Sequence, residues 1–158
     1  MDIPKARVNH LSVVARDLEE SVRFYVELFG MVPIATPNFG FPVQWLAVGG
    51  LQFHLFQRAE AAPTHHHVAF TVAHDDFPAF YRQVRQLGIT DDQRFGHHLY
   101  RLPGDAAQLY ILDPSDNLIE VDCAKASLLP AEIQAEMRPL AAPQTPESAA
   151  ATLYLEQP

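Results

Sequence analysis

Residues 9–30 read NHLSVVARDLEESVRFYVELFG, and this stretch decides the fold. Its first part, up to Ala15, is a short apolar run that is typical of a strand. Asp17 then offers a carboxylate that can cap a helix, and Glu20, three residues further on, completes a pattern like a capping box. Gly30 suits the left-handed residue that ends many helices. Between these signals the apolar residues recur at three-to-four spacing, which predicts a helix whose buried stripe is Leu18, Val22, Tyr25, Val26 and Phe29.

The same pattern returns in the second half of the chain. His67 starts another strand-like run, Asp75 or Asp76 can cap a second helix, and Gly88 ends it. The two strand–helix units have almost the same length, which indicates a duplicated domain half rather than an array of short repeats. We expect the buried stripe of the second helix to consist of Phe77, Phe80, Val84 and Leu87.

Each helix is followed by strands that apolar runs and turn residues predict. The expected strands span residues 43–48, 51–56, 108–112 and 117–122. The first two flank Gly49-Gly50, a pair that suits a hairpin turn because glycine accepts positive φ. The last two flank an Asp-Pro-Ser-Asp turn. We therefore expect an α+β fold of two βαβββ modules, about residues 6–58 and 64–124, within a single domain over residues 1–124.

The remainder of the chain is expected to add a loop, a helix and an arm. The second module is the longer because of residues 91–107, which we expect to form a loop that contains His97, His98 and Arg101. Residues 125–158 should form a C-terminal helix and arm. The helix is predicted at residues 128–140, with Pro130 in its first turn. Its buried side would consist of Ile133, Met137 and Leu140. Residues 141–158 are rich in Ala, Pro, Thr and Gln, which is typical of an arm.

The composition limits the kinds of partner. Of the 158 residues, 48% are hydrophobic, which is enough to bury a core, and the formal net charge of −8 disfavours binding to nucleic acid or to an anionic membrane. The single cysteine, Cys123, excludes an intrachain disulfide and a cysteine-based zinc site. No apolar run is long enough to span a membrane, and the N-terminus lacks the pattern of a signal peptide. We therefore expect a soluble cytoplasmic protein.

Ligand-type residues occupy four positions that are equivalent under the duplication. These positions lie on the first and last strands of each half and are occupied by His10, His54, His67 and Glu120. Strand alternation gives each half an apolar face that suits packing against its helix, and turns these ionisable groups to the opposite face. A lone strand histidine is usually structural, and Glu120 alone could be a solvated edge residue. Ionisable groups on a partly buried concave face are costly unless they are paired or bound to metal. Two imidazoles with one carboxylate form the facial triad of non-haem Fe(II) oxygenases.

Four segments carry a resemblance to a known family: residues 9–15, 17–30, 66–72 (HHVAFTV) and 113–121 (DPSDNLIEV). Through them the chain resembles the vicinal oxygen chelate superfamily, the group of glyoxalases, bleomycin resistance proteins and extradiol dioxygenases, over about residues 6–124. The resemblance implies that the paired modules form a cup-shaped mixed β-sheet around one divalent metal ion. It also implies that the metal ligands are His10, His67 and Glu120.

The branches of this superfamily differ in the residues around the metal. Glyoxalase I-like members usually have a glutamate as a fourth ligand where this chain has His54. Fosfomycin thiol transferases share the triad but typically carry basic and potassium-binding residues around the phosphonate, whereas only Lys125 and Arg138 follow Glu120 here. Bleomycin-binding members lack the triad, which this chain has in full.

Type I extradiol dioxygenases are more similar in spacing. They place an acid–base histidine a short way before the second metal histidine, as His54 stands before His67. Their tyrosine before the metal glutamate corresponds to Tyr110, and a further substrate-binding histidine corresponds to His98. The resemblance therefore implies His54, Tyr110 and His98 as catalytic residues, Fe(II) as the metal, and a catechol with O2 as substrates.

The sequence leaves several alternatives open. His97 and Arg101 are rivals of His98, and His54 could be a fourth metal ligand or a packed, inert histidine. A non-redox lyase, isomerase or thiol transferase would use the same ligands with Mn(II), Zn(II) or Ni(II), and a non-catalytic small-molecule-binding protein is a further alternative. We expect a homodimer, because C2 dimers are the commonest closed assemblies. The metal site could be made within one chain or between two.

Overall fold

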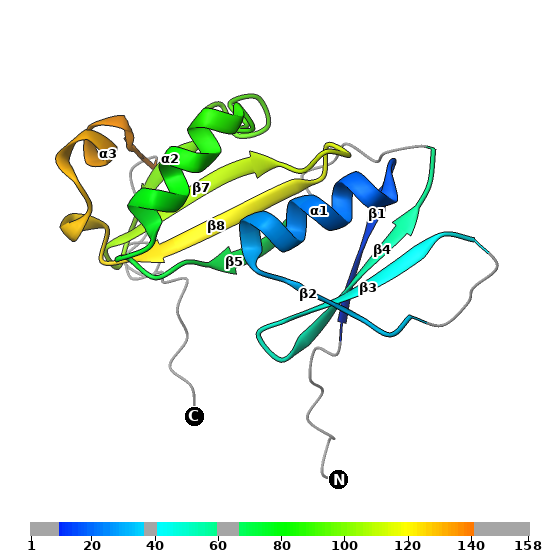
Figure 1. The fold of residues 1–158 in the computed structure, drawn as a ribbon. Coiled ribbons are helices and arrows are strands. Elements are labelled where there is room, and N and C mark those ends of the chain that lie inside the picture. The colour runs from blue at the N-terminus through cyan, green and yellow to red at the C-terminus, as the bar shows by residue number, and fades with distance from the viewer. Residues whose placement is uncertain (1–9, 37–40, 60–66, 141–158) are drawn as a thin grey trace, which may run out of the picture. The chain divides into compact units, whose positions relative to one another are not determined.

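The computed structural model describes residues 10–36, 41–59 and 67–140, and Figure 1 shows their elements. The chain divides into two compact units. The first comprises the described residues up to Ala59 together with residues 113–117, and the second comprises the others from His67 on. The arm expected at residues 141–158 lies outside the described residues. Among the described residues, no helix is long and apolar enough to cross a membrane.

The first unit is one βαβββ module. Its sheet has the strand order β1-β4-β3-β2, with β1 parallel to β4 and the other neighbours antiparallel. Gly49 and Gly50 join β3 to β4 with φ values of 55° and 80°, as expected for a glycine hairpin turn. The elements of this unit are β1 (His10–Ala15), α1 (Leu18–Phe29), β2 (Val32–Ile34), β3 (Val43–Val48) and β4 (Leu51–Gln57).

Helix α1 begins and ends where the sequence predicts. The Asp17 carboxylate accepts a hydrogen bond from the Glu20 backbone N–H at 2.9 Å, and Gly30 closes the helix at φ 64°. The buried face is narrower than predicted, because only Ser21 and Tyr25 are fully buried while the rest of the expected stripe is partly exposed. The Tyr25 ring packs on Phe53 of β4 with centroids 4.7 Å apart, which fixes the helix on the sheet.

The turn at residues 113–117 is bound to the first unit through the Asp113 carboxylate. Asp113 Oδ1 accepts the backbone N–H groups of Ser115 and Asn117, both at 2.8 Å. Asp113 Oδ2 accepts the Tyr25 hydroxyl at 3.0 Å and Asn117 Nδ2 at 2.7 Å. Asn117 Nδ2 also donates to the Val14 carbonyl of β1 at 2.6 Å. Burial raises the pKa of Asp113, against the opposing effect of these hydrogen bonds.

The second unit repeats the βαβββ order and adds a C-terminal extension. Its sheet has the order β5-β8-β7-β6-β9, with β5 parallel to β8 and β6 antiparallel to β7. The prediction of an α+β fold with two βαβββ modules is therefore confirmed. The elements are β5 (His67–Thr71), α2 (Phe77–Leu87), β6 (Leu99–Leu102), β7 (Ala106–Leu112), β8 (Leu118–Ala124), η1 (Ala126–Leu128), α3 (Ala131–Glu136) and β9 (Arg138–Pro139).

Two details of the second module differ from the prediction. The buried residues of α2 are Phe77, Tyr81 and Val84, whereas Leu87 is exposed. Tyr81 is buried because its hydroxyl has hydrogen-bond partners, so a tyrosine replaces an apolar residue in the expected stripe. Residues 91–107 do not form one long loop, because β6 lies within them and places Arg101 on a strand.

The C-terminal helix is much shorter than residues 128–140. Helix α3 begins after Pro130, ends at Glu136, and buries Ile133. Met137 is already extended, and the next two residues pair with β6 as strand β9. Pro139 explains this, because the residue before a proline is disfavoured in helical conformation. Leu140, which was expected on the buried side of the helix, is exposed.

Candidate metal centre

Strands β7 and β8 present four buried polar side chains on one face of the second sheet. Tyr110 pairs with Glu120 across the two strands, and Gln108 pairs with Asp122. Side chains two residues apart on a strand point to the same face. Each of these residues is at most 9% exposed, so their polar atoms are withdrawn from bulk water. Such a group needs internal partners or a bound ion.

His67 completes this group from the neighbouring strand. It opens β5, which pairs in parallel with β8, and its Nε2 lies 3.1 Å from Glu120 Oε2. The His67 ring stands edge-on to the rings of Tyr110 and Phe95. The structure therefore brings together three of the predicted site residues: His67, Tyr110 and Glu120.

The electrostatics of this face favour a cation. Burial, and then the charge of Glu120, raises the pKa of Asp122 to about 7. Among the described residues, Asp122 Oδ1 is one of the buried side-chain atoms without a hydrogen-bond partner. Burial and Glu120 also raise the pKa of Tyr110, so its hydroxyl keeps its proton, which it donates to Gln108 Oε1 at 2.9 Å. Two buried carboxylates beside an imidazole are a donor set that fits a divalent metal ion.

His54 lies on β4 of the first unit, on the face opposite the buried Phe53 and Leu55. Its Nε2 is 2.9 Å from Gln52 Oε1, and its ring stacks on Trp45 with centroids 4.1 Å apart and planes at 5°. His10 opens β1, where its backbone pairs with Gln52; its side chain lies outside what the structure describes. The acid–base role of His54 and the ligand role of His10 stay predictions.

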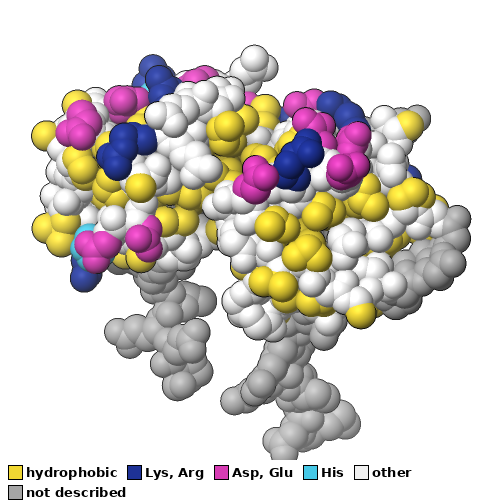
Figure 2. Space-filling view, in the orientation of Figure 1, with side chains coloured by type: hydrophobic (Ala, Val, Ile, Leu, Met, Phe, Trp, Pro, Cys, Tyr) yellow, Lys and Arg dark blue, Asp and Glu magenta, His cyan; other side chains and the backbone are white. Residues whose placement is uncertain are grey.

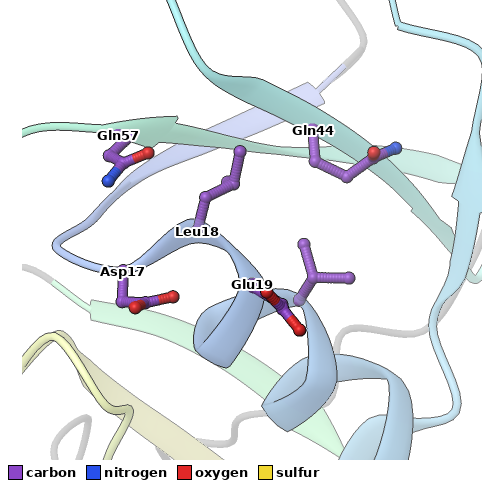
Figure 3. A pocket seen from close by; sticks show the side chains of 6 residues that line it. Asp17, Leu18, Glu19, Gln44 and Gln57 are labelled. Carbon is purple, nitrogen blue, oxygen red and sulfur yellow. The ribbon is translucent and has the colours of Figure 1, made fainter.

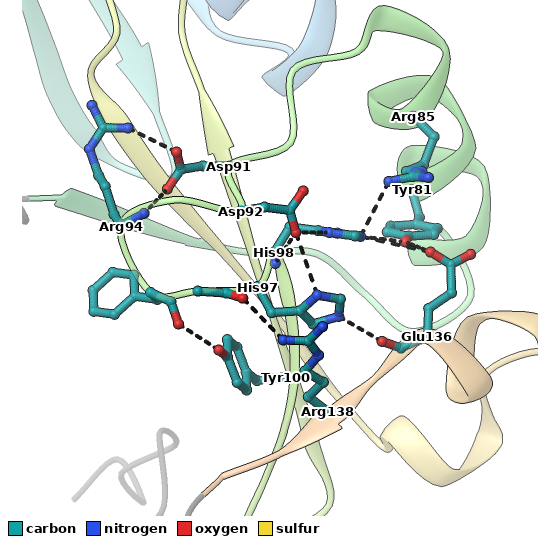
Figure 4. Close-up of polar contacts among 12 residues, drawn as sticks. Tyr81, Arg85, Asp91, Asp92, Arg94, His97, His98, Tyr100, Glu136 and Arg138 are labelled. Atoms are coloured by element: carbon teal, nitrogen blue, oxygen red, sulfur yellow. Dashed lines mark hydrogen bonds and ion pairs between the residues drawn. The ribbon is translucent and has the colours of Figure 1, made fainter.

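His98 belongs to a different group of side chains, between α2 and α3 (Figure 4). The residue is 4% exposed, and its ring forms hydrogen bonds with Tyr81 through Nε2 at 2.9 Å and with Asp92 through Nδ1 at 2.8 Å. His97 and Arg101, the alternatives to His98, also form hydrogen bonds with α3. His97 Nε2 bonds the Glu136 carbonyl, and Arg101 donates to Gln134. A substrate-binding role for His98 stays a prediction.

A cavity of about 420 Å³ lies in the first unit beside the start of α1 (Figure 3). Among the side chains that the structure describes, none of the predicted site residues lines it. Its described wall combines the acidic first turn of the helix with two glutamines of the sheet and contains no histidine. The lining residues are Asp17, Leu18, Glu19, Val22, Gln44 and Gln57.

Two βαβββ modules, with a histidine paired to a buried glutamate on the sheet of the second, define a vicinal oxygen chelate protein. Residues 7–121 match the model of the Glyoxalase/Bleomycin resistance protein/Dioxygenase superfamily, and the chain therefore belongs to that superfamily. It is 30% identical over 120 residues to the glutathione transferase FosA of Serratia marcescens, covering 72% of this chain and 78% of that one. It is 28% identical over 120 residues to the metallothiol transferase FosB of Lysinibacillus sphaericus, covering 72% and 79%.

Solved structures agree on the fold. A protein classed in the glyoxalase family from Bacillus anthracis is 26% identical with a TM-score of 0.60, covering 79% of this chain and all of that one. The fosfomycin resistance protein FosX of Listeria monocytogenes, solved in complex with Mn(II) and sulfate, has a TM-score of 0.61 at 16% identity, covering 77% and 92%. This second likeness shows the fold alone.

These relatives change the preferred branch of the superfamily. Membership of the vicinal oxygen chelate superfamily is confirmed, but the closeness to extradiol dioxygenases that the sequence favoured is not supported. That preference rested on the spacing of His54 and Tyr110 from the expected ligands. Strand alternation in the sequence already placed Asp122 on the face of Glu120, but Asp122 was not counted among the site residues. Gln108 was not considered; its pairing with Asp122 across β7 and β8 places it on the same face.

Proposed function

We propose that the chain is a metal-dependent, non-redox enzyme that transfers a small thiol, such as glutathione, to an electrophilic small molecule. The observation that carries the proposal is the His67–Glu120 pair at 3.1 Å, beside a second buried carboxylate. It occurs in a chain that is 30% identical to a glutathione transferase over most of its length. This function replaces ring cleavage by Fe(II) and O2 as the favoured interpretation.

His67 and Glu120 would hold the metal ion, with His10 as the third ligand that the family resemblance implies. Imidazole and carboxylate donors suit Mn2+, Zn2+, Ni2+ and Fe2+ alike, so the ligands do not select iron. When bound, such an ion polarises a substrate oxygen as a Lewis acid.

Tyr110 is proposed as a positioning residue for Glu120. Its hydroxyl remains protonated, because burial and the Glu120 charge raise its pKa, and it is held by Gln108 Oε1. A hydroxyl has one proton, so Tyr110 orients the Glu120 carboxylate when it turns that proton from Gln108 Oε1 to Glu120, its cross-strand neighbour and hydrogen-bonding partner.

The proposed reaction needs no oxidant. The thiol sulfur forms a bond to a substrate carbon, a C–O bond at that carbon breaks with its electron pair moving to oxygen, and the thiol proton is finally carried by that oxygen. For this proton transfer we propose His54, to which the family resemblance gives an acid–base role, since imidazole accepts and returns protons near neutral pH.

The charges of the chain favour a substrate that is less anionic than a phosphonate. After Glu120 the only basic residues are Lys125 and Arg138, and Arg138 donates a hydrogen bond to the Gly96 carbonyl. A second candidate function is isomerisation of a small substrate in the manner of a glyoxalase. It is favoured by 25% identity over 135 residues to "Glyoxylase I 4" of Arabidopsis thaliana, covering 78% of this chain and 74% of that one.

The test is thiol consumption by protein that has been stripped of metal and reloaded with Mn2+, Zn2+ or Ni2+. Glutathione is offered with a panel of electrophiles that includes fosfomycin. Glu120→Gln should reduce turnover by about 100-fold or more, because it removes a charged ligand. Glu132→Gln, at an exposed glutamate of α3, is the matched control and should leave turnover unchanged. Equal turnover in the two variants would refute the proposed centre.

A further inference from the structure

Three metal-binding side chains meet in the second unit, in the segment between α2 and β6 (Figure 4). Asp92, His97 and His98 each offer one ligand atom, and these atoms all lie within 4.8 Å of one another. Asp92 Oδ1 is 2.8 Å from His98 Nδ1 and 3.4 Å from His97 Nδ1. The two rings are largely buried, whereas Asp92 is exposed, so the group opens to solvent on the side of the carboxylate.

The Nε2 atom of His97 acts as a hydrogen-bond donor. His97 Nε2 lies 2.8 Å from the backbone oxygen of Glu136. A carbonyl oxygen only accepts hydrogen bonds, so Nε2 carries the proton. In the neutral ring, Nδ1 therefore presents a lone pair toward the Asp92 carboxylate.

The same reasoning applies to His98 through a longer chain of hydrogen bonds. The Tyr81 hydroxyl donates its one proton to Glu136 Oε2 at 2.6 Å, so its oxygen accepts from His98 Nε2 at 2.9 Å. Arg85 Nη1 lies farther from the same nitrogen, at 3.5 Å. His98 Nδ1 is thus left with its lone pair facing Asp92 Oδ1, which also accepts the backbone N–H of His98 at 3.0 Å.

We propose that Asp92, His97 and His98 form a second metal site, which binds a divalent transition-metal ion of the Zn2+ class. In the neutral rings the two nitrogen lone pairs and the carboxylate oxygen repel one another. A second proton on each ring relieves this pair by pair, as an ion pair with Asp92, whereas one divalent cation satisfies all three atoms at once. In protein metal sites the other ring N–H of a ligating histidine is held by a carbonyl or a similar acceptor, as it is here.

The distances suit such an ion. Tetrahedral ligands at Zn–N and Zn–O lengths of about 2.0–2.1 Å lie about 3.3 Å from one another. The His97–Asp92 separation already has this value, and the His98–Asp92 separation needs to widen by about half an ångström. The fourth position faces the solvent side of Asp92. This site shares no residue with the proposed His67–Glu120 centre, so neither proposal depends on the other.

The test counts Zn2+ ions per chain by native mass spectrometry and measures their affinity by competition with a chromogenic chelator. The background is the full chain with His65→Asn and His66→Asn, which removes the neighbours of His67 in the run of three histidines. Asp92→Asn and His97→Gln should each remove one Zn2+ per chain, through an affinity loss of about 100-fold or more. Tyr81→Phe keeps the packing but removes the hydroxyl, and should weaken the same ion by about 10–100-fold.

Matched controls separate this site from other histidines. Asp75→Asn alters the His74–Asp75 pair, in which Asp75 is exposed and the two atoms are 3.1 Å apart, and should change neither the number of bound Zn2+ ions nor their affinity. Glu120→Gln removes the ion of the proposed catalytic centre and should leave the Asp92 ion in place. If Glu120→Gln has no effect while Asp92→Asn still removes an ion, only the proposed function fails. If Asp92→Asn, His97→Gln and Tyr81→Phe bind Zn2+ as Asp75→Asn does, the second site does not exist.

Discussion

The carboxylate of Asp113 holds the turn at residues 113–117 against α1 and β1, and its replacement tests how the first unit is stabilised. Asp113 is 4% exposed and accepts four hydrogen bonds, two at each oxygen. In Asp113→Asn one oxygen can still accept the backbone N–H groups of Ser115 and Asn117. The new amide nitrogen then faces the Tyr25 hydroxyl, which can turn and accept, and Asn117 Nδ2, which cannot.

The expected loss of stability follows from these contacts. One buried donor–donor contact and the loss of charge-assisted hydrogen bonds cost about 2–4 kcal/mol together. Burial raises the pKa of Asp113, so removing the buried charge returns part of this cost. The net loss should be about 1–3 kcal/mol, which lowers the Tm by about 2–4 °C per kcal/mol in a chain of this size.

The assay is thermal unfolding followed by the fluorescence of Trp45, the single tryptophan, which lies in the first unit. The matched control is Asp116→Asn in the same turn. Asp116 is half exposed and pairs with Arg16 at 2.6 Å, so its loss should cost at most about 1 kcal/mol. If Asp113→Asn and Asp116→Asn unfold at the same temperature, the buried hydrogen bonds do not hold the unit as argued.

Three further substitutions test the Asp105–Ser127 contact, the end of α1 at Gly30 and the proposed role of His54. Asp105 accepts both the backbone N–H and the hydroxyl of Ser127, which holds its pKa below the ordinary value of 3.8. The stabilisation by the Asp105 carboxylate is therefore present above that pH and is lost as the pH falls through the lowered pKa. The Tm difference between wild type and Asp105→Asn, which corresponds to about 1 kcal/mol at pH 7, should therefore disappear under acidic conditions. A difference that persists at pH 2 contradicts this. Gly30→Ala puts a side chain at φ 64° and should cost about 1 kcal/mol in chemical denaturation, whereas no loss would mean that the left-handed cap is unimportant. His54→Phe keeps the stack on Trp45 and should preserve the fold seen by circular dichroism while slowing thiol transfer by about 100-fold; full activity would remove His54 from the mechanism.

Local signals in the sequence predicted several ends of elements in the first unit. The Asp17 cap, the Gly30 terminus and the glycine turn between β3 and β4 depend on neighbouring residues, and the structure has all three. The alternation of β8 likewise predicted that Glu120 faces away from Ile119 and Val121, which are buried on the other side.

Features that depend on distant residues were missed. Ser21 is buried on α1 because its hydroxyl meets Ser115 of the turn at 3.4 Å, a contact that no helical periodicity can indicate. Tyr81 replaces Leu87 in the buried face of α2 because His98 and Glu136 offer partners for its hydroxyl. The grouping of Asp92, His97 and His98 was missed for the same reason. It depends on Glu136 of α3, which is hydrogen-bonded to His97 and to Tyr81.

On the face shown in Figure 2, acidic and basic side chains are interspersed, and neither sign of charge forms a continuous patch. This pattern agrees with a small-molecule enzyme better than with a protein that binds a polyanion. The predicted homodimer stays a prediction.

We propose that the His67–Glu120 centre supports thiol transfer rather than oxygen chemistry. The most direct measurement follows glutathione and dissolved O2 together in one anaerobically purified sample of known metal content, with electrophiles and catechols offered in turn. With Mn2+, Zn2+ or Ni2+ bound, we expect glutathione to be consumed in step with formation of a thioether product. We expect no O2 uptake with catechols. Uptake of O2 with a catechol by iron-loaded protein, without thiol consumption under any metal, would contradict the proposal.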